Sequence, residues 1–203
     1  MTAARDEVLA RLRAALKGAP PPGPIPRGYR RDDSGPPDVE LFVDRLVDYK
    51  AVVSRCGPAD VAGAVGAALD GVPSLVVPVD APAEWLSAYG GEVRPDDGLD
   101  LSTLDGTAAV LTGCAVAIAE TGTIVLDAGT AQGRRAVSLV PDLHVCVVHS
   151  GQIVNSVPAA LRRLDPRRPL TFISGPSATS DIELNRVEGV HGPRRLHIVL
   201  VSG

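Results

Sequence analysis

Short, continuous apolar segments place the strongest constraint on what this chain can fold into. The segment from Ser74 to Pro78 has no polar face, so a strand made from it is buried on both sides. Segments of this kind alternate with helix-sized amphipathic stretches between residues 38 and 89. Such alternation is typical of a mainly parallel sheet covered by helices on both faces, and we therefore expect an α/β fold.

The same patterns predict the individual elements, with more strands in the second half of the chain than in the first. The predicted strands are 51–56, 74–78, 108–111, 115–119, 123–126, 136–140, 144–148, 170–173 and 196–201. The predicted helices are 3–17, 39–47, 58–69, 83–89, 157–164 and 181–188.

Three segments of different character divide the chain. Residues 1–17 contain an amphipathic helix with Val8, Leu12 and Leu16 at helical spacing. Residues 18–37 hold seven prolines, which predict an extended linker. Residues 38–203 then form the main domain, to which the first helix is tethered.

Composition excludes several classes of function. One Trp, three Tyr and two Phe, with a net charge of -4, provide neither a stacking platform nor a basic field for nucleic acid. Three dispersed cysteines without a CxxC pattern predict no disulfide framework, no metal site and no iron–sulfur cluster held by this chain alone. Asp6 and Glu7 stand where a signal peptide would have its apolar region, and the longest apolar stretch, 108–119, is too short to cross a bilayer. We expect a cytoplasmic protein.

The first candidate site is the turn Glu120-Thr121-Gly122-Thr123, between two predicted strands. Gly122 permits a left-handed backbone there. In the simpler interpretation this is a hairpin with Glu120 in solvent at its tip. In the functional interpretation Glu120 is a catalytic base or nucleophile, and Thr121, Gly122 and Thr123 supply hydroxyls and amides that bind substrate.

The second candidate site is the loop after the predicted strand 170–173. Ser174, Gly175, Ser177 and Thr179 precede a predicted helix, whose free amides and dipole favour an anion. The loop contains neither a Walker A motif nor GxGxxG. The following Ser-x-x-Glu at 180–183 also matches a capping box, so part of this segment is explained by helix capping alone.

Further polar residues are weaker candidates. His191 lies between two glycines, ten residues after Asp181, and we include both as candidate catalytic residues, although a lone histidine is often structural. Arg134 is equally well explained as a bidentate carboxylate ligand or a solvated loop end. His144 and Cys146 share one face of a strand, where core packing is favoured over a metal site.

Four motifs follow one another in order. They are Ala-Glu-Thr-Gly-Thr at 119–123; Arg134 with Ser-Leu-Val-Pro-Asp-Leu-His at 138–144; Ser-Gly-Pro-Ser-Ala-Thr-Ser-Asp-Ile-Glu at 174–183; and Gly-Val-His-Gly-Pro-Arg-Arg-Leu-His-Ile at 189–198. This series resembles the LUD domain family, in its lactate utilization C branch, over about residues 38–201. The resemblance implies a fold like that of NagB, RpiA and the CoA-transferases. It also implies a role in oxidising L-lactate to pyruvate beside two iron–sulfur partner proteins.

Two functions remain open at this point. The first is a subunit of a lactate-oxidising complex; because this chain lacks a cofactor site of its own, its partners would carry the iron–sulfur clusters and the electrons. The second is an independent enzyme of the CoA-transferase type, with Glu120 as the nucleophile that forms a thioester. The length of the chain weakens the second, since such transferases usually pair two domains of this size.

Removal of residues 1–37 should leave the main domain folded. The linker has little apolar surface to bury, and the first helix is short. Thermal melts of the full and truncated chains should therefore differ by only a few degrees. Aggregation of the truncated chain would show instead that the first helix completes the core.

Overall fold

The computed structural model describes residues 2–20, 23–28, 35–179, 187–188 and 192–203. Residues 1–30 and 31–203 form two separate compact units. In the first unit, helix α1 (Thr2–Ala15) presents Val8 and Leu12 at a spacing of four residues, and both side chains are more than half exposed. No helix in the described ranges is long and apolar enough to span a membrane.

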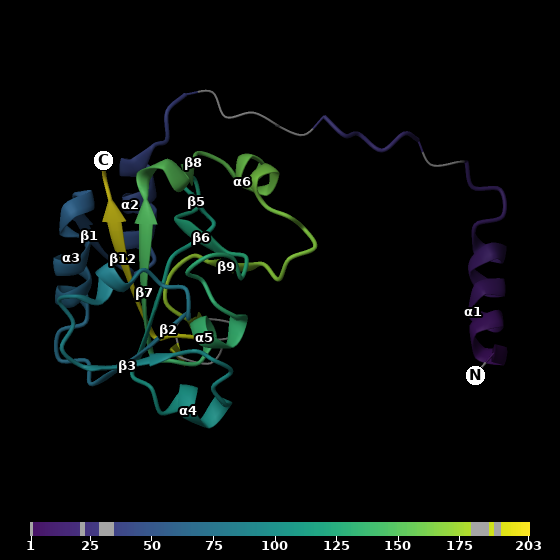
Figure 1. Cartoon of the computed structure of the whole chain (residues 1–203). Helices are drawn as coiled ribbons and strands as arrows, with labels where there is room; N and C mark the ends of the chain where they lie inside the picture. Colours follow the sequence, from purple (N-terminus) through teal and green to yellow (C-terminus); the bar gives the residue numbers. More distant parts are fainter. Residues whose placement is uncertain (1, 21–22, 29–34, 180–186, 189–191) are drawn as a thin grey trace. The chain divides into compact units, whose positions relative to one another are not determined.

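The second unit is built on a sheet of six strands whose neighbours are all parallel (Figure 1). In spatial order the strands are β1 (Val52–Cys56), β12 (Arg195–Val201), β7 (Leu143–His149), β4 (Ala109–Thr112), β2 (Ser74–Val77) and β3 (Glu92–Pro95). β2 and β4 are buried throughout, as are six of the seven residues of β7. The predicted mainly parallel α/β fold is therefore confirmed.

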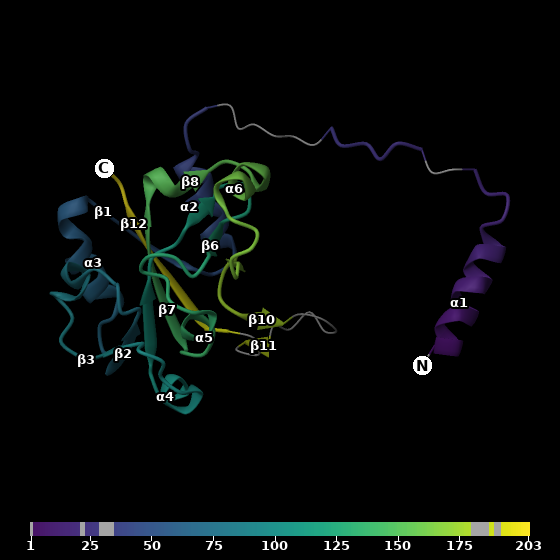
Figure 2. The ribbon, with the colours of Figure 1, turned by 45° about the vertical axis from the view of Figure 1, so that its right-hand side comes forward.

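A second, mixed sheet packs beside the first. Its order is β8 (Ile153–Val154), β5 (Val116–Ile118), β6 (Thr123–Leu126) and β9 (Thr171–Ile173). β5 pairs parallel with β8, whereas the β5–β6 and β6–β9 pairs are antiparallel. A separate antiparallel pair joins β10 (Ala178–Thr179) to β11 (Val187–Glu188), and Figure 2 shows it near the start of β12.

Helical segments fill the connections between these strands. The α-helices are α2 (Val39–Asp48), α3 (Val61–Ala68), α4 (Leu101–Asp105), α5 (Arg135–Leu139) and α6 (Val157–Arg163). The 3-10 turns are η1 (Pro58–Asp60), η2 (Ala83–Leu86) and η3 (Ser150–Gln152). Capping follows the sequence: Asp38, Asp100 and Ser156 accept a backbone N–H at the starts of α2, α4 and α6.

The two faces of the large sheet are covered differently. On one face, α3 and Trp85 of η2 pack on alternate residues of β2, β4, β7 and β12. On the other face, Phe42 and Leu46 of α2 share a core with residues of the second sheet, while α4 and α5 cover Val76 and Val110. α6 closes the outer face of the second sheet (Figure 1). One face is thus covered by helix and turn, and the other by helices together with a second sheet.

One predicted element was wrong, and a second is mostly untested. Segment 136–140 forms helix α5 instead of a strand: Ala136, Val137 and Val140 pack against the sheet from one side of a helical turn, at helical rather than alternating spacing. The predicted helix 181–188 falls mostly outside the described residues, and its last two residues belong to strand β11. Strand β3 was missed because an edge strand with a largely exposed, polar sequence lacks the apolar signal.

His144 lies inside the protein, as its strand position predicted. Its side chain is 1% exposed, and Nε2 is 2.8 Å from Thr112 Oγ1 on β4. Burial lowers the pKa of His144 from its ordinary value of 6.5 to about 4, because the charged imidazolium loses its hydration in the core. The imidazole is therefore neutral near pH 7.

Replacement of His144 with Gln should make the free energy of unfolding depend less on pH between pH 6.5 and about pH 4. Below pH 6.5 the unfolded chain binds a proton that native His144 does not bind until about pH 4, so stability falls as the pH is lowered through that window. This linkage amounts to about 3 kcal/mol at most. Urea unfolding at a series of pH values between 7 and 4 gives the free energy of unfolding, and its plot against pH should be steeper for the wild-type chain than for the variant. Equal slopes for the wild-type and variant chains would contradict the assignment.

Candidate functional site

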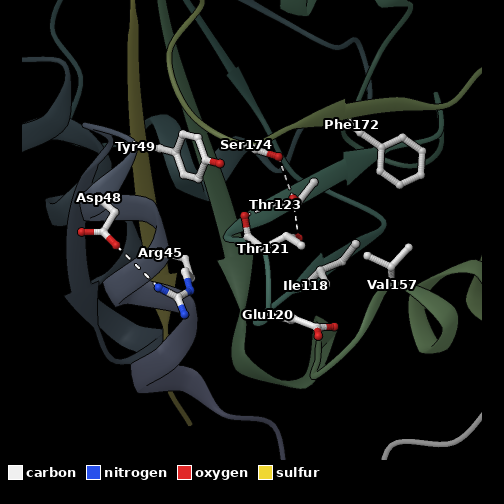
Figure 3. A pocket seen from close by; sticks show the side chains of 10 residues that line it. All are labelled: Arg45, Asp48, Tyr49, Ile118, Glu120, Thr121, Thr123, Val157, Phe172 and Ser174. Atoms are coloured by element: carbon white, nitrogen blue, oxygen red, sulfur yellow. Dashed lines mark hydrogen bonds and ion pairs between the residues drawn. The ribbon is translucent and has the colours of Figure 1, made fainter. Parts of the chain in front are cut away.

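A cleft of about 720 Å³ brings together residues from α2, the β5–β6 hairpin, β9 and the loop after it (Figure 3). Glu120, Thr121 and Thr123 line it from the hairpin, and Ser174 lines it from the loop. The two candidate sites that lie about fifty residues apart in the sequence thus share one cavity. We describe this space below as the cleft.

Backbone hydrogen bonds on both sides hold Glu120 at the hairpin tip. The Gly122 amide donates to the Ala119 carbonyl at 3.3 Å, which closes the turn. The Glu120 amide donates to the Asn155 carbonyl at 3.1 Å, just beyond β8. The Glu120 side chain is exposed and lines the cleft. The hairpin predicted by the simpler interpretation therefore exists, and it presents the carboxylate to a cavity.

A chain of hydroxyl groups connects the hairpin to the serine loop. Thr123 Oγ1 is 2.7 Å from Thr121 Oγ1 and 2.7 Å from Ser174 Oγ. Thr123 is buried, so these contacts satisfy a polar group that would otherwise be costly inside the protein. The network fixes the Ser174 hydroxyl relative to the hairpin (Figure 3).

Two glycines allow both turns to touch helix α2. Gly122 has φ +57°, and a Cβ built on it would lie 2.6 Å from Arg45 Cβ and 2.9 Å from the Leu46 amide nitrogen. Gly175 has φ +131°, and a Cβ there would lie 2.8 Å from Tyr49 Cβ. A side chain at either position would therefore meet both backbone strain and a collision.

Arg45 is the cation of the cleft, and sequence analysis did not single it out. It extends from α2 on the side of the cleft opposite Glu120 (Figure 3). Its guanidinium lies 3.6 Å from Asp48 and 3.7 Å from Asp44, and its side chain is 44% exposed. The neighbours Phe42 and Leu46, which are buried, fix which side of α2 faces the core. That orientation, which places Arg45 in the cleft, follows from tertiary packing and carries no local sequence signal.

The other predicted site residues lie in several places. Gly175 and Ser177 line a smaller cavity next to the cleft. Thr179 belongs to β10 and pairs with Val187, and the residues directly after it lie outside the described ranges. Asp181 and His191 lie outside the described residues, as do both capping-box residues at 180 and 183.

Arg134 is engaged elsewhere. It donates to both carboxylate oxygens of Asp96, at 2.8 and 2.9 Å, and also to the Leu99 carbonyl. The Asp96 side chain is only 4% exposed. Arg134 therefore neutralises a buried carboxylate, which would be left unpaired if the guanidinium turned to a substrate.

Potential metal ligands do not gather in the described part of the chain, where no group of three or more His, Cys, Asp or Glu side chains could hold an ion. All three cysteines are free thiols, with Cys114 and Cys146 buried and Cys56 partly buried. The described residues of the cleft offer two carboxylates, those of Glu120 and Asp48, together with a guanidinium and hydroxyls, a set suited to a small polar organic molecule.

Comparison with known proteins places this architecture in a family. The model of the LUD domain matches residues 82–201, which is more than half of the chain. The chain belongs to the LUD domain family. The match includes the hairpin with Glu120, His144 and Ser174, whereas α2 with Arg45 lies before it.

Individual relatives resemble this LUD protein over different lengths. Lactate utilization protein C of Deinococcus radiodurans is 45% identical over 98% of this chain and 96% of its own. Lactate utilization protein C of Halalkalibacterium halodurans is 39% identical over 42% of this chain and 40% of its own. The crystal structure of a DUF162 family protein from Deinococcus radiodurans superposes with a TM-score of 0.70 at 42% identity, covering 80% of this chain and 94% of that one.

Substitution of Gly122 with Ala should destabilise the LUD domain by about 2 kcal/mol or more, because the added Cβ meets a left-handed backbone and the α2 main chain together. Urea denaturation gives the free energy of unfolding. Gly63→Ala in α3 is the matched control, since a Cβ there meets nothing within 4 Å and a helical alanine stabilises. Equal effects of the two substitutions would refute the contact.

Proposed function

We propose that this LUD protein is a component of an L-lactate utilization system. In this proposal it works with iron–sulfur partner proteins that oxidise L-lactate to pyruvate, and it binds a small carboxylate in the cleft, close to the serine loop. The observation that carries the proposal is the meeting of Glu120, Arg45 and the Thr123–Ser174 hydroxyl pair in one cavity. Support for lactate comes from the lactate utilization protein C of Deinococcus radiodurans, which matches nearly the whole chain.

The cleft has complementary groups for a 2-hydroxy acid. A guanidinium can hold a carboxylate through two parallel hydrogen bonds, and Arg45 occupies one side of the cleft. Glu120, on the other side, can accept a hydrogen bond from a hydroxyl group and act as a general base toward it. A 2-hydroxy acid has both groups on adjacent carbons. This proposal assigns the carboxylate to Arg45, whereas the helix start at residue 181 that was first expected to bind an anion lies outside the described residues.

Electron transfer is the part of the reaction that this proposal assigns to partners. Oxidation of lactate releases two electrons, whereas the sequence has three dispersed cysteines and no dinucleotide fingerprint. We therefore assign substrate binding and proton transfer to this chain, and the redox centres to the iron–sulfur proteins.

A CoA-transferase-like activity is the second candidate. It is favoured by the exposed carboxylate of Glu120 at the tip of a hairpin beside a large cleft. In that reaction the Glu120 carboxylate would attack the thioester of an acyl-CoA, forming an acyl-glutamyl anhydride and releasing the CoA thiolate. The thiolate would then attack the glutamyl carbonyl, forming a Glu120–CoA thioester and releasing the acyl group as a free carboxylate. Intact-mass measurement after incubation with an acyl-CoA would detect a covalent adduct, which Glu120→Gln should abolish.

Lactate oxidation by the reconstituted complex tests the first proposal. Glu120→Gln should lower kcat about a hundredfold, because it keeps size but removes the base. Arg45→Gln should raise KM roughly tenfold to a hundredfold, because it removes a charge-assisted bond to the carboxylate. The isolated chain should show no turnover with an artificial electron acceptor.

Arg167→Gln provides the matched control for that assay. Its side chain is 88% exposed and pairs with Asp165 outside the cleft, so kcat and KM should not change. Gel filtration of each complex separates lost chemistry from lost assembly. Wild-type kinetics for both cleft variants, or turnover by the isolated chain, would overturn the proposal.

A further inference from the structure

A separate pocket of about 480 Å³ lies at the carboxyl ends of the parallel strands and shares no described residue with the cleft. Three neighbouring strands contribute to it: His149 is the last residue of β7, Gly113 directly follows β4, and Pro82 lies in the connection after β2. In open α/β sheets, ligands bind in crevices at this edge, and pockets for small molecules have volumes of about 300–1,000 Å³. We describe this space below as the edge pocket.

Two arginines give the described lining of the edge pocket an excess of positive charge. Arg168 is 43% exposed at its side chain and forms an ion pair with Asp127 at 3.2 Å. Arg163 is exposed, and among the described residues its guanidinium hydrogen-bonds only to the Gly151 carbonyl, at 3.2 Å. Because Arg168 uses the charge of Asp127, the charge of Arg163 is left for a ligand, together with most of its N–H donors.

Asp127 holds Arg168 in position. Its carbonyl accepts from Nε of Arg168 at 2.9 Å, and its carboxylate also accepts from the Gly129 amide at 3.0 Å. The Asp127 side chain is 12% exposed, so its own charge is covered by these partners. The contacts use Nε and Nη1 of Arg168, and the guanidinium has further N–H groups that can donate to a ligand.

His149 adds a hydrogen-bond donor at the edge of the sheet. Its side chain is exposed and accepts a hydrogen bond from the Gln152 backbone amide. A ring nitrogen that accepts carries a lone pair, so the proton of the imidazole is on the other nitrogen. The Gln152 side chain in turn accepts from the His149 amide at 2.8 Å and donates to the Cys114 carbonyl at 2.6 Å. This network ties the imidazole donor to the ends of both β7 and β4.

The connection after β6, which lines another side of the edge pocket, has an unusual backbone for its residues. Ala128 has φ +55° and Ala131 has φ +57°, a conformation that favours glycine. Ala131 is held from two sides: its amide donates to Asp80 Oδ2 at 3.0 Å, and its carbonyl accepts from the Gly113 amide at 2.7 Å. Strained backbone persists only where the surrounding structure fixes it, and it is concentrated at ligand-binding sites.

An apolar wall completes the description of the edge pocket. Pro82, Trp85 and Ala115 form it. An inorganic anion bound to the arginines would leave this wall in contact with water, whereas the carbon skeleton of an organic anion would cover it, and burial of apolar surface is favourable. The pocket therefore suits a molecule with an anionic end and an apolar end.

We propose that the edge pocket is a second ligand site, for a small organic acid or phosphate ester. The oxyanion of the ligand bonds to Arg163, Arg168 and the N–H of His149, and its carbon skeleton lies against Pro82 and Trp85. A carboxylate and a phosphate present the same pair of acceptor oxygens to a guanidinium. The site uses no residue of the cleft, so it does not depend on the function proposed above.

Fluorescence of Trp85 tests the proposal directly, because Trp85 is the only tryptophan of the chain and lines the edge pocket. The full chain is titrated with phenylacetate and phenyl phosphate as anionic probes, and with 2-phenylethanol as a neutral probe of similar size. At least one anion should change the fluorescence saturably and bind about tenfold tighter than the neutral probe, or more. The anion that binds more tightly identifies a carboxylate or a phosphate as the preferred group.

Variants locate the binding. Arg163→Gln should weaken binding of the anion about tenfold or more, and it leaves no buried carboxylate unpaired, unlike a change at Arg168. Arg167→Gln is the matched control, because it removes the same charge from a side chain that is 88% exposed and pairs with Asp165. Glu120→Gln should also bind as the wild type does, since Glu120 lines the cleft instead.

Three results would overturn the proposal. The first is the absence of a saturable change in Trp85 fluorescence with both anions. The second is equal affinity for 2-phenylethanol and for the anions, which would show that the arginines take no part. The third is an equal loss of affinity in Arg163→Gln and Arg167→Gln, which would show a general effect of net charge.

Discussion

Direct contact between helix α2 and two glycine turns determines the shape of the candidate site. Gly122 and Gly175 lie so close to residues 45–49 that no Cβ fits at either glycine, and each adopts a backbone with positive φ. Phe42 and Leu46 of α2 are buried in the core and fix the position of the helix. Hairpin, serine loop and helix therefore have fixed relative positions, and the side chains that they present need little reorganisation to bind a ligand.

Because the parallel sheet is buried on both faces, a polar residue inside this domain must find a hydrogen-bond partner there. Strands β2 and β4 lie in an apolar environment on both faces, where each polar atom needs a partner. Thr112 and His144 break this pattern on neighbouring strands and satisfy each other through one nitrogen only. Thr123 breaks it in the second sheet and is satisfied by Thr121 and Ser174. Of these residues, Thr123 lines the cleft and His144 lines the smaller cavity beside it.

Sequence predicts those parts of this structure that depend on local interactions. Continuous apolar runs such as 74–77 predicted the large sheet, because burial on both faces leaves a direct mark on composition. The turn at Gly122 was also found from a local signal, because a glycine between two strands permits the left-handed backbone that a tight turn needs. By contrast, segment 136–140 was assigned to the wrong element, since five residues are too few to distinguish a buried helical turn from a strand.

The candidate site was predictable only in part. Glu120, Thr123 and Ser174 were found from local motifs, and the structure brings them together. Arg45 was not found, because its place in the cleft depends on how α2 rotates about its axis when Phe42 and Leu46 are buried. Arg134 matched a binding pattern, yet its charge is used by Asp96, thirty-eight residues away. Long-range pairing of this kind leaves no trace in a single sequence.

The fold shields the thiols of this chain rather than activating them. A cysteine reacts as its thiolate, which forms readily only where the pKa of the cysteine is low. Here the contact with Cys146, together with burial, raises the pKa of Cys114, and burial also raises the pKa of Cys56. These two cysteines therefore favour the protonated thiol, which is a weak nucleophile. In the function proposed above, the contribution of this domain is a preformed cleft with a base and a cation, which holds the substrate, and electron transfer is assigned to partner proteins.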